Sequence, residues 1–512
     1  MCRIPDPDST SGYCSDYFLI IFIHGPGFKR SCLQQGFGCI LLQVSRIICL
    51  IRKGKNMFSF IRRNNPRKFR RSVSISRIMA LAFLGIIAAG TLLLSLPASS
   101  RSGRSAGFLT SLFTATSATC VTGLVMGDTW SLWTPLGQGI ILVMIQVGGL
   151  GFMSAASLAW FTLRKKIGLR SQMVMAEAIG ASMDDIPAHQ RRLMTRSFAV
   201  EGIGALLLTA RFSMDVPFLQ ALKLGVFHSI SAFCNAGFDI LGFRTPGASL
   251  MEYHTDPAVC LILSALVILG GLGFLVWDEV LRERNPRNWS VYTKLVLSVT
   301  AALLLLGMLL TCVLEWNNPL TLGPLSFGRK LLAAFFQSMT LRTAGFAGLD
   351  QALLTPASKA VSIFLMLIGG SSGSTAGGLK TVTFVVLLMF LWTRLRGRST
   401  VSVVHRTIAD SHVLNAITIF MVMVGLGFIG GTFICATSAV GFADALYEAV
   451  SALGTVGLST GITPSLQPAA KVMIIIFMYF GRVGILTISF GFLKTKPAGE
   501  KYRYANTDLL IG

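Results

Sequence analysis

The chain has 512 residues, of which 53% are hydrophobic and 13% are charged. A soluble globular domain carries roughly 25% charged residues, and apolar stretches recur in this chain at the length needed to cross ~30 Å of hydrocarbon. The composition therefore argues against a cytosolic protein and predicts a polytopic membrane protein. The net charge of +23 would suggest nucleic acid in a soluble chain, but membrane proteins collect Lys and Arg on one side of the bilayer. No nucleic-acid partner is expected.

The first 56 residues differ from the rest of the chain. They hold five of the ten cysteines and two short apolar runs, around Tyr17 to Ile23 and Phe37 to Ile51, neither of which is a convincing span. The first run lacks the basic start and small-residue cleavage site of a signal peptide. Residues 57–77, which open at Met57, form a basic cytoplasmic start. Our hypothesis is that translation begins at Met57 and that residues 1–56 are a non-native or disordered extension.

Eight apolar segments are predicted to cross the membrane. In chain order they are Ile78 to Pro97, Thr129 to Leu163, Phe198 to Ala210, Pro257 to Trp277, Leu295 to Leu314, Ala360 to Leu379, Val413 to Ala443 and Val472 to Leu493. With a cytoplasmic N-terminus, the inside segments contain 26 Lys and Arg and the outside segments contain 10. This is the positive-inside pattern, so both termini are expected in the cytoplasm.

Each outside segment ends with a stretch that is too apolar for a loop and too short to cross. Aligned on one glycine, the four stretches read FTATSATCVTGL (Phe113 to Leu124), FHSISAFCNAGF (Phe227 to Phe238), FFQSMTLRTAGF (Phe335 to Phe346) and YEAVSALGTVGL (Tyr447 to Leu458). An aromatic residue stands ten positions before each glycine. The glycines are 114, 108 and 112 residues apart, which indicates an internal repeat of helix, re-entrant segment and helix.

Four such segments can surround one pore, because non-helical backbone at membrane depth must be buried in protein or line a watery cavity. Each is predicted to form a short helix from the aromatic to about three residues before the glycine, then a turn that offers carbonyl oxygens to a dehydrated cation. A Cβ at the hinge would forbid φ > 0 or crowd the axis. The predicted filter residues, whose main-chain carbonyls would hold K+, are Val121, Thr122, Gly123, Asn235, Ala236, Gly237, Thr343, Ala344, Gly345, Thr455, Val456 and Gly457.

With these motifs, residues of about 72 to 495 resemble the superfamily of Trk, Ktr and HKT cation transporters. Eight spans and the segment GGSSGSTAGGLKT make the chain most similar to the KtrB (NtpJ-like) branch. The resemblance implies an all-α membrane protein whose four membrane-pore-membrane repeats look like a tetrameric K+ channel fused into one chain. It also implies a homodimer and a cytosolic ring of RCK-type nucleotide-binding subunits as the regulatory partner. One filter glycine per repeat, where a channel has two, implies fewer ordered ion sites.

The predicted organisation follows the repeats. An extension, 1–56, and a basic N-terminus, 57–77, precede repeat 1 at 78–163, a linker with repeat 2 at 164–283, repeat 3 at 284–395, repeat 4 at 396–493 and a cytoplasmic tail at 494–512. Within repeat 3, residues 369–378 interrupt an apolar helix with Gly and Ser, which suits an unwound chain inside a cavity. By resemblance this segment is the intramembrane gate loop beneath the filter.

The predicted gate combines this loop with two basic residues. Arg482 lies in the middle of the eighth predicted span, where a charge is costly unless it faces a cavity or a partner. We interpret it as a fixed positive charge below the filter that bonds loop carbonyls, and Lys380 as the cytoplasmic edge of the loop. The gate residues are Gly369, Gly370, Ser371, Ser372, Gly373, Ser374, Thr375, Ala376, Gly377, Gly378, Lys380 and Arg482. Arg342 is expected to anchor the third pore segment.

Other interpretations of these motifs remain open at this point. The sequence GGSSG at Gly369 to Gly373 matches GxSxG and could belong to an intramembrane serine hydrolase, with His228 as the base. A phosphate-binding loop in GSTAGGLKT is interrupted by Leu379 and lacks a preceding strand. A secondary transporter for a larger solute would need inverted repeats, whereas these run parallel. Glu201 and Glu315 either pair with polar groups of the pore segments or coordinate ions.

The sequence thus predicts a multi-pass plasma (inner) membrane protein for K+ uptake, driven by the membrane potential. It is not predicted to be an enzyme and needs no organic cofactor. A Na+-selective or Na+/K+ transporter of the same fold is the alternative, and coupling to Na+ stays open.

Overall fold

The computed structural model describes residues 75–151, 186–398, 400–403 and 406–484. Contacts within the chain separate Met1–Ser72 from Val73–Gly512, and every described residue belongs to the second unit. Two predicted parts, the extension 1–56 and the tail 494–512, lie outside the described residues.

The regular secondary structure of the described residues is almost entirely helical and follows the predicted repeat. The first helices of the four repeats are α3 (Ile75–Leu94), α9 (Ile186–Phe212), α13 (Val291–Glu315) and α17 (Asp410–Ser438). The helices of the re-entrant segments, hereafter the pore helices, are α4 (Phe108–Cys120), α10 (Phe218–Phe233), α14 (Phe327–Thr340) and α18 (Phe442–Gly454). The second helices are α6 (Pro135–Gly149), α11 (Pro257–Leu272), α15 (Pro356–Leu367) and α19 (Pro468–Val483).

The remaining elements connect these helices. They are α5 (Thr129–Leu132), α12 (Phe274–Arg282), α16 (Thr381–Leu395) and the short 3-10 helices Pro97–Ser99, Met251–Tyr253, Pro286–Asn288, Gln351–Leu353 and Thr463–Ser465. Between α16 and α17, strands β1 (Ser402–Val403) and β2 (Arg406–Thr407) pair antiparallel, with Ser402 opposite Thr407. Within the described part of the chain these are the only strands.

The second helices are shorter than the predicted spans because each is broken on the same side of the filter. By length and composition, three described helices can cross a membrane, Arg191–Phe212, Val291–Glu315 and Asp410–Ser438, and α11 with α12 forms a fourth candidate that is bent by 97°. The prediction of one continuous span from Pro257 to Trp277 was therefore wrong. Within the predicted spans from Thr129 to Leu163, Ala360 to Leu379 and Val472 to Leu493, the helices α6, α15 and α19 end at Gly149, Leu367 and Val483.

Local sequence explains where these helices begin and end. Proline is the first residue of all four, at Pro135, Pro257, Pro356 and Pro468, and proline suits this position because its missing N–H would have no helical partner. Each of the four interruptions contains a glycine with positive φ, Gly151 at 82°, Gly273 at 88°, Gly373 at 73° and Gly484 at 89°. At Gly273 a Cβ would lie 3.0 Å from the carbonyl oxygen of Ser372, so close packing also requires glycine there.

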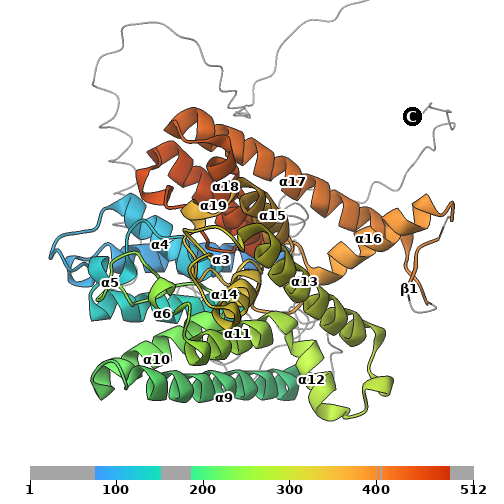
Figure 1. Ribbon diagram of the computed structural model, residues 1–512, viewed down its shortest axis with the longest axis horizontal. Coiled ribbons are helices and arrows are strands. Elements are labelled where there is room, and N and C mark those ends of the chain that lie inside the picture. The colour runs from blue at the N-terminus through green and yellow to red at the C-terminus, as the bar shows by residue number, and fades with distance from the viewer. Residues whose placement is uncertain (1–74, 152–185, 399, 404–405, 485–512) are drawn as a thin grey trace, which may run out of the picture. The chain divides into compact units, whose positions relative to one another are not determined.

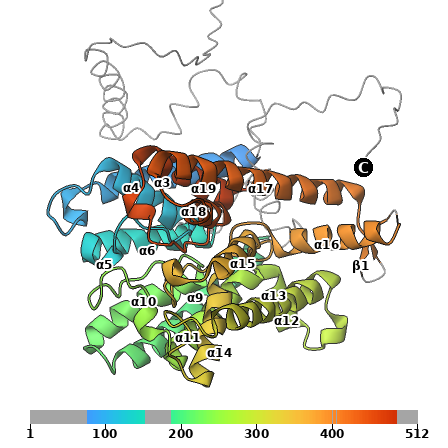
Figure 2. The ribbon, with the colours of Figure 1, turned by 45° about the horizontal axis from the view of Figure 1, so that its top comes forward.

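The same helix-to-helix contacts recur in all four repeats, and repeat 4 contacts repeat 1. Each first helix lies against the pore helix of its own repeat, as Figures 1 and 2 show for α9 with α10 and α17 with α18. Each second helix lies against the pore helix of the next repeat, in the pairs α6 with α10, α11 with α14, α15 with α18 and α19 with α4. The last pair joins repeat 4 to repeat 1. The four repeats therefore form a ring with the pore helices inside it.

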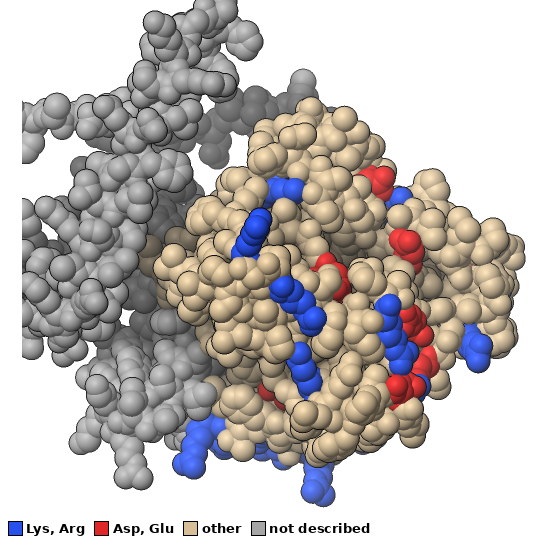
Figure 3. All heavy atoms as spheres, turned by 90° about the vertical axis from the view of Figure 1, so that its left-hand side faces the viewer, with Lys and Arg blue, Asp and Glu red and all other residues tan. Residues whose placement is uncertain are grey.

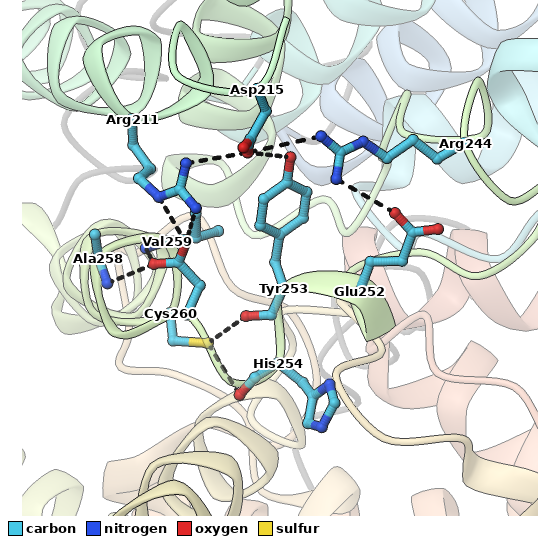
Figure 4. A network of polar contacts seen from close by, with 10 residues as sticks. Arg211, Asp215, Arg244, Glu252, Tyr253, His254, Ala258, Val259 and Cys260 are labelled. Atoms are coloured by element: carbon cyan, nitrogen blue, oxygen red, sulfur yellow. Dashed lines mark hydrogen bonds and ion pairs between the residues drawn. The ribbon is translucent and has the colours of Figure 1, made fainter.

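A polar cluster ties the end of α9 to the start of α11 (Figure 4). Arg211 donates to Asp256 at 2.6 Å and to Asp215 at 3.0 Å, and the Tyr253 hydroxyl also donates to Asp215. Arg244 extends the cluster through ion pairs to Asp215 at 3.7 Å and to Glu252 at 3.6 Å. These side chains keep a quarter to a third of their surface exposed in most cases, so the cluster belongs to the protein surface.

Candidate functional site

The four predicted filter turns share one backbone conformation. The glycines Gly123, Gly237, Gly345 and Gly457 have φ of 94°, 69°, 78° and 95°. Two residues before each, a residue with a side chain is also left-handed: Val121 at 56°, Asn235 at 58°, Thr343 at 61° and Thr455 at 52°. Positive φ is uncommon for residues other than glycine. Its recurrence at one position of all four repeats makes this turn a built feature of the fold.

The four turns meet in a closed ring. A Cβ added to Gly123 would lie 2.6 Å from the carbonyl oxygen of Ala236, one on Gly237 would lie 2.8 Å from that of Ala344, and one on Gly345 would lie 2.5 Å from that of Val456. A Cβ on Gly457 would meet the carbonyl oxygen of Thr122, which returns the ring to repeat 1. In every repeat, the glycine abuts the carbonyl of the residue before the next glycine, and no side chain fits between.

Hydroxyl groups of the pore helices hold the turns. Ser117 and Ser451 accept hydrogen bonds from the main-chain N–H of Gly123 and Gly457, each at 3.1 Å. Ser231 and Thr340 instead donate to the carbonyls that follow the glycines in repeats 2 and 3, those of Phe238 at 2.7 Å and Phe346 at 2.8 Å. The turn is therefore fixed from its own helix in every repeat.

The pore helices end near the predicted position but begin earlier than predicted. They end three residues before the glycine in repeats 1 and 4 and four or five before it in repeats 2 and 3. They start at Phe108, Phe218, Phe327 and Phe442, five to nine residues ahead of the aligned aromatics. The prediction that the helix starts at the aromatic was wrong, because that aromatic is an interior residue of the helix: Phe113, Phe227 and Tyr447 are at most 3% exposed.

Oxygen atoms without partners lie in the ring. The hydroxyls of Thr122 and Thr455 are buried, and among the described residues neither has a hydrogen-bond partner. Above the ring lies a cavity of about 520 Å³ that is lined by all four filter glycines. A narrow ring of carbonyl and hydroxyl oxygens that opens into a cavity can take a cation that has shed its water.

On the other side of the ring, residues 369–378 form an irregular loop that touches the filter. The Thr375 hydroxyl donates to the Asn235 side chain at 2.9 Å and to the Phe233 carbonyl at 3.1 Å. A Cβ on Gly377 would meet the side chain of Thr455. The loop therefore lies directly beneath the turns of repeats 2 and 4.

Neighbouring main-chain carbonyls and one side-chain hydroxyl satisfy polar groups of this loop. The N–H of Ser371 donates to the Gly271 carbonyl at 3.0 Å, and that of Thr375 donates to the Gly270 carbonyl at 3.2 Å. The Tyr292 hydroxyl donates to the Ser372 carbonyl at 3.0 Å. Such contacts supply the hydrogen bonds that irregular backbone needs at membrane depth. The break in α11 provides two of the acceptors.

Arg482 joins this loop to repeat 1. Its guanidinium donates to the carbonyl of Thr375, and it also donates to the carbonyls of Gly148 and Gly149, the latter at 2.9 Å. The position of Arg482 differs from the prediction, because α19 ends at Val483 and the arginine stands in its last turn. It therefore does not lie in the middle of a helix, and its three acceptors are carbonyls freed by breaks in the main chain.

The two other basic residues of this region also bond the loop. Arg342 is 9% exposed and donates to the carbonyl of Gly369 at 3.2 Å and to the hydroxyl of Thr381 at 3.3 Å. The Lys380 ammonium donates to the Ala376 carbonyl at 2.8 Å. Arg342 thus links the third filter segment to the first residue of the loop and to the first residue of α16.

Glu201 and Glu315, the two glutamates singled out in the sequence, pair with polar groups of the repeats. Gln146 of α6 donates to both carboxylate oxygens of Glu201, at 2.9 and 3.0 Å, which ties repeat 1 to repeat 2. Glu315 accepts from Asn318, from Thr321 and from both the N–H and the hydroxyl of Thr355, at 2.6 to 2.9 Å. These contacts account for both carboxylates without an ion.

The geometry does not favour the hydrolase interpretation. His228 lies within α10, not at its start as predicted, and its Nδ1 pairs with the Leu224 carbonyl at 2.8 Å. The Ser371 hydroxyl donates to the Leu272 carbonyl. In the described part of the chain no hydrogen bond joins His228 to Ser371 or Ser372, as a nucleophile and its base would require. The phosphate-loop interpretation fails likewise, because helix α15 precedes the loop.

Sequence reasoning missed two features of the site. One is the early end of the second helices. In repeats 1 and 2 the sequence GGLGF, at Gly148 to Phe152 and Gly270 to Phe274, marks this position. The other is a set of carboxylates around the outer cavity, Asp128, Asp239 and Asp350. Asp128 and Asp350 both stand five residues after a filter glycine, and aligning the sequences beyond that glycine would have revealed them.

Four re-entrant segments that close around one axis, with an irregular loop beneath, define a membrane protein with a fused fourfold pore. The family model described as TrkH, cation transport protein, matches residues 44–504, and the chain belongs to this family. It is a family of cation transporters and not of enzymes, which confirms the prediction that the chain is not an enzyme.

Individual relatives agree with this assignment. The chain is 37% identical to the potassium/sodium uptake protein NtpJ of Enterococcus hirae, over 87% of this chain and 99% of that protein. It is 38% identical to the Ktr system potassium uptake protein B of Bacillus subtilis, over 83% and 94%. The crystal structure of the potassium transporter TrkH from Vibrio parahaemolyticus matches with a TM-score of 0.65 and 18% identity, over 84% of this chain and 87% of that one. The predicted fold class and the resemblance are confirmed.

Proposed function

We propose that the chain is the pore-forming subunit of a K+ uptake system. The observation that carries this proposal is the ring of four filter glycines at the floor of the outer cavity. The relatives named above are potassium or potassium/sodium uptake proteins, which supports K+ as the transported ion. Inward flux would be driven by the membrane potential, which contributes ~2.3 kcal/mol per charge at 100 mV.

In this proposal the ion passes the main-chain carbonyls of the twelve filter residues. The carbonyls of Thr122, Ala236, Ala344 and Val456 lie at the ring contacts, and the free hydroxyls of Thr122 and Thr455 add oxygen atoms. Replacing the hydration shell with such oxygens selects among monovalent cations. Because each repeat supplies a single glycine turn, a Na+-selective or Na+/K+ pore of the same fold is the second candidate, and one relative bears both ions in its name.

Residues 369–378, with Lys380 and Arg482, would act as the gate. The loop touches the filter through Thr375, and Arg482 holds the loop by the same residue. A guanidinium beneath the filter adds a positive charge that opposes cation passage. Opening would require the loop to leave these contacts.

The gate would be controlled from the cytoplasm. We place both termini and the basic linkers on the cytoplasmic side of the plasma (inner) membrane, because 26 Lys and Arg lie in the segments assigned to that side. One relative is named as part of a Ktr system, which supports a separate regulatory partner. A ring of RCK-type nucleotide-binding subunits would then bind this face, and the membrane subunit would be a homodimer.

Growth of a bacterial strain that lacks K+ uptake tests the proposal. The wild-type chain, expressed with a cognate ring subunit, is expected to restore growth on limiting K+, and Gly457→Asp is expected to abolish the rescue. At this position φ is 95° and a Cβ would meet the Thr122 carbonyl, so any side chain distorts the ring.

Gly441→Asp is the matched control. Gly441 precedes α18 with an ordinary φ of −60°, and aspartate is favoured at a helix N-cap. Both variants must reach the membrane at wild-type levels. Rescue by Gly457→Asp equal to that of Gly441→Asp would refute the fourfold filter. Growth that depends on Na+ in place of K+ would favour the second candidate.

A further inference from the structure

The cavity next to the filter, hereafter the outer cavity, is lined by three carboxylate residues. The four filter glycines line it, and its lining also includes Asp128, Asp239 and Asp350. These carboxylates come from repeats 1, 2 and 3. Asp128 and Asp350 belong to repeats that face each other across the ring, since each repeat contacts the next in cyclic order.

No basic residue balances these carboxylates. Among the described residues, neither Lys, Arg nor His lines the cavity, and no ion pair to Asp128, Asp239 or Asp350 occurs there. In Figure 3, which faces the side of the molecule that carries α5, acidic and basic side chains lie next to one another on the surface. Carboxylates around a cavity focus a negative potential into it.

A second observation on the wall of repeat 4 points to a ligand. Thr460 lines the cavity and is 7% exposed, and its hydroxyl has no hydrogen-bond partner in the described part of the chain. Behind it, Glu448 is fully buried, and one of its carboxylate oxygens also lacks such a partner. Its other oxygen accepts from Thr463, which lines the cavity. Buried polar atoms are normally paired with protein or ordered water, so the Thr460 hydroxyl lacks a partner that the cavity can supply.

The spacing of the groups determines the kind of ligand. In the described residues, no three Asp, Glu, His or Cys side chains converge closely enough to bind a metal ion directly. An ion in the cavity must therefore keep most of its water and contact the wall through that water. The cavity of about 520 Å³ has room for such a shell at ~30 Å³ per water. Mg2+ sheds water reluctantly and is commonly bound through one or two carboxylates and several waters.

We propose that the outer cavity is a binding site for a hydrated divalent cation of the Mg2+ type, which occupies the mouth of the filter and inhibits K+ entry. The site rests on the proposed function, because it deepens the account of the same pore. Asp128, Asp239 and Asp350 supply the charge, and the Thr460 hydroxyl accepts from or donates to the water shell. A doubly charged ion is favoured over K+ by a cavity with several negative charges, yet it cannot enter a filter that requires dehydration.

Binding is measured directly and does not depend on transport. Purified full-length protein in detergent is titrated with Mn2+ as a stand-in for Mg2+, and free aqueous Mn2+ is followed by electron paramagnetic resonance. The double variant Asp128→Asn with Asp350→Asn is expected to weaken Mn2+ binding about tenfold or more. Asparagine keeps the oxygen that accepts from Ser131 at 2.8 Å and from Ala352 at 2.9 Å, so the loops retain their turns. Glu252→Gln, a carboxylate outside the cavity lining, is the control and should bind like wild type.

Equal Mn2+ binding by the wild type and the double variant would overturn the inference, as would an absence of binding in the wild type. Transport gives an independent reading. In liposomes loaded for K+ uptake, millimolar external Mg2+ should inhibit the wild type and Glu252→Gln but not the double variant. K+ flux that is insensitive to Mg2+ in all three would overturn the inference while leaving the proposed function intact. Mn2+ binding that is lost in the double variant, in a chain that conducts no K+, would support this site and refute the proposed function.

Discussion

The two sides of the filter ring differ in charge and in filling. On one side, the ring opens into a cavity of about 520 Å³ that is lined by three aspartates and, within the described residues, by no basic side chain. On the other side, residues 369–378 lie against the turns, and the side chains that bond this loop include Arg342, Lys380 and Arg482. A cation is thus attracted to one mouth of the ring and opposed at the other.

This difference arises where repeats depart from their common pattern. When the repeats are aligned on the glycines Gly148, Gly270, Gly369 and Gly481, the next residue is glycine in the first three repeats and arginine, Arg482, in the fourth. On the outer side, Asp128 and Asp350 stand five residues after the filter glycine, where repeat 4 has Ile462. The fourfold scaffold builds a symmetric ring, and a few positions that differ between repeats give the pathway its direction.

Removal of the inner charge tests this comparison most severely. Arg482→Ala is expected to raise basal K+ flux in the absence of a regulatory partner by about tenfold or more. The variant loses the hydrogen bonds from the guanidinium to the carbonyls of Thr375, Gly148 and Gly149. A single hydrogen bond to a charged group contributes roughly 1.5–3 kcal/mol. Because ~1.4 kcal/mol of barrier corresponds to a tenfold change in rate, loss of one such bond is enough for the expected increase. Efflux from K+-loaded liposomes, normalised to the amount of inserted protein, measures the change.

Arg482→Lys separates charge from hydrogen bonding. Lysine keeps the positive charge but cannot reproduce the planar fork of guanidinium donors. Flux close to wild type in this variant would assign the barrier to charge, and flux close to that of Arg482→Ala would assign it to the bonds that hold the loop. Equal flux in wild type and Arg482→Ala would contradict the role of this residue in the gate.

The outer side should respond to pH. Burial and the nearby carboxylate of Asp128 raise the pKa of Asp239 from 3.8 to about 6, against the effect of the Leu241 N–H and the Ser249 hydroxyl, which stabilise the charged form. The carboxylate is therefore charged above that pH and loses its charge below it. Inhibition of K+ flux by external Mg2+ is expected to weaken about threefold between roughly pH 7.5 and pH 5 as this charge is lost.

Asp239→Asn fixes the neutral state for comparison. In this variant the Mg2+ concentration that halves K+ flux should be the same at both pH values and close to the wild-type value at the acidic one. If the variant kept the full pH dependence, another group would be responsible for it, and Asp239 would have no part in the divalent site.

The sequence predicted the parts of the pathway that recur. The glycine, the aromatic ten residues before it and the charge bias of the loops are each present four times or more, so four pore segments could be aligned without a structure. The left-handed conformation of Val121, Asn235, Thr343 and Thr455 was not predicted, because a β-branched residue such as valine disfavours positive φ.

Other features could not be predicted because their cause is tertiary. Glycine is frequent in membrane helices for close packing, so Gly273 and Gly484 do not by themselves indicate a break. The break at Gly273 exists because the loop of repeat 3 passes beside it, with Ser371 donating to the Leu272 carbonyl. Likewise, the acceptors of Arg482 at Gly148 and Gly149 are some 330 residues away in sequence and become available only when the ring closes.

Among the substitutions considered, one in the surface cluster of Figure 4 is expected to have the smallest effect on K+ flux and Mg2+ inhibition. Arg244→Gln removes ion pairs to Asp215 at 3.7 Å and Glu252 at 3.6 Å, and about a third of the arginine side chain is exposed. Such pairs contribute ~0.2–1 kcal/mol, so thermal unfolding in detergent should shift by only a few degrees or less, with K+ flux and Mg2+ inhibition unchanged. No change in the Mg2+ response is expected, because Arg244 does not line the cavity. An altered Mg2+ response in this variant would show that charges beyond the cavity wall also set the electrostatic potential in the cavity.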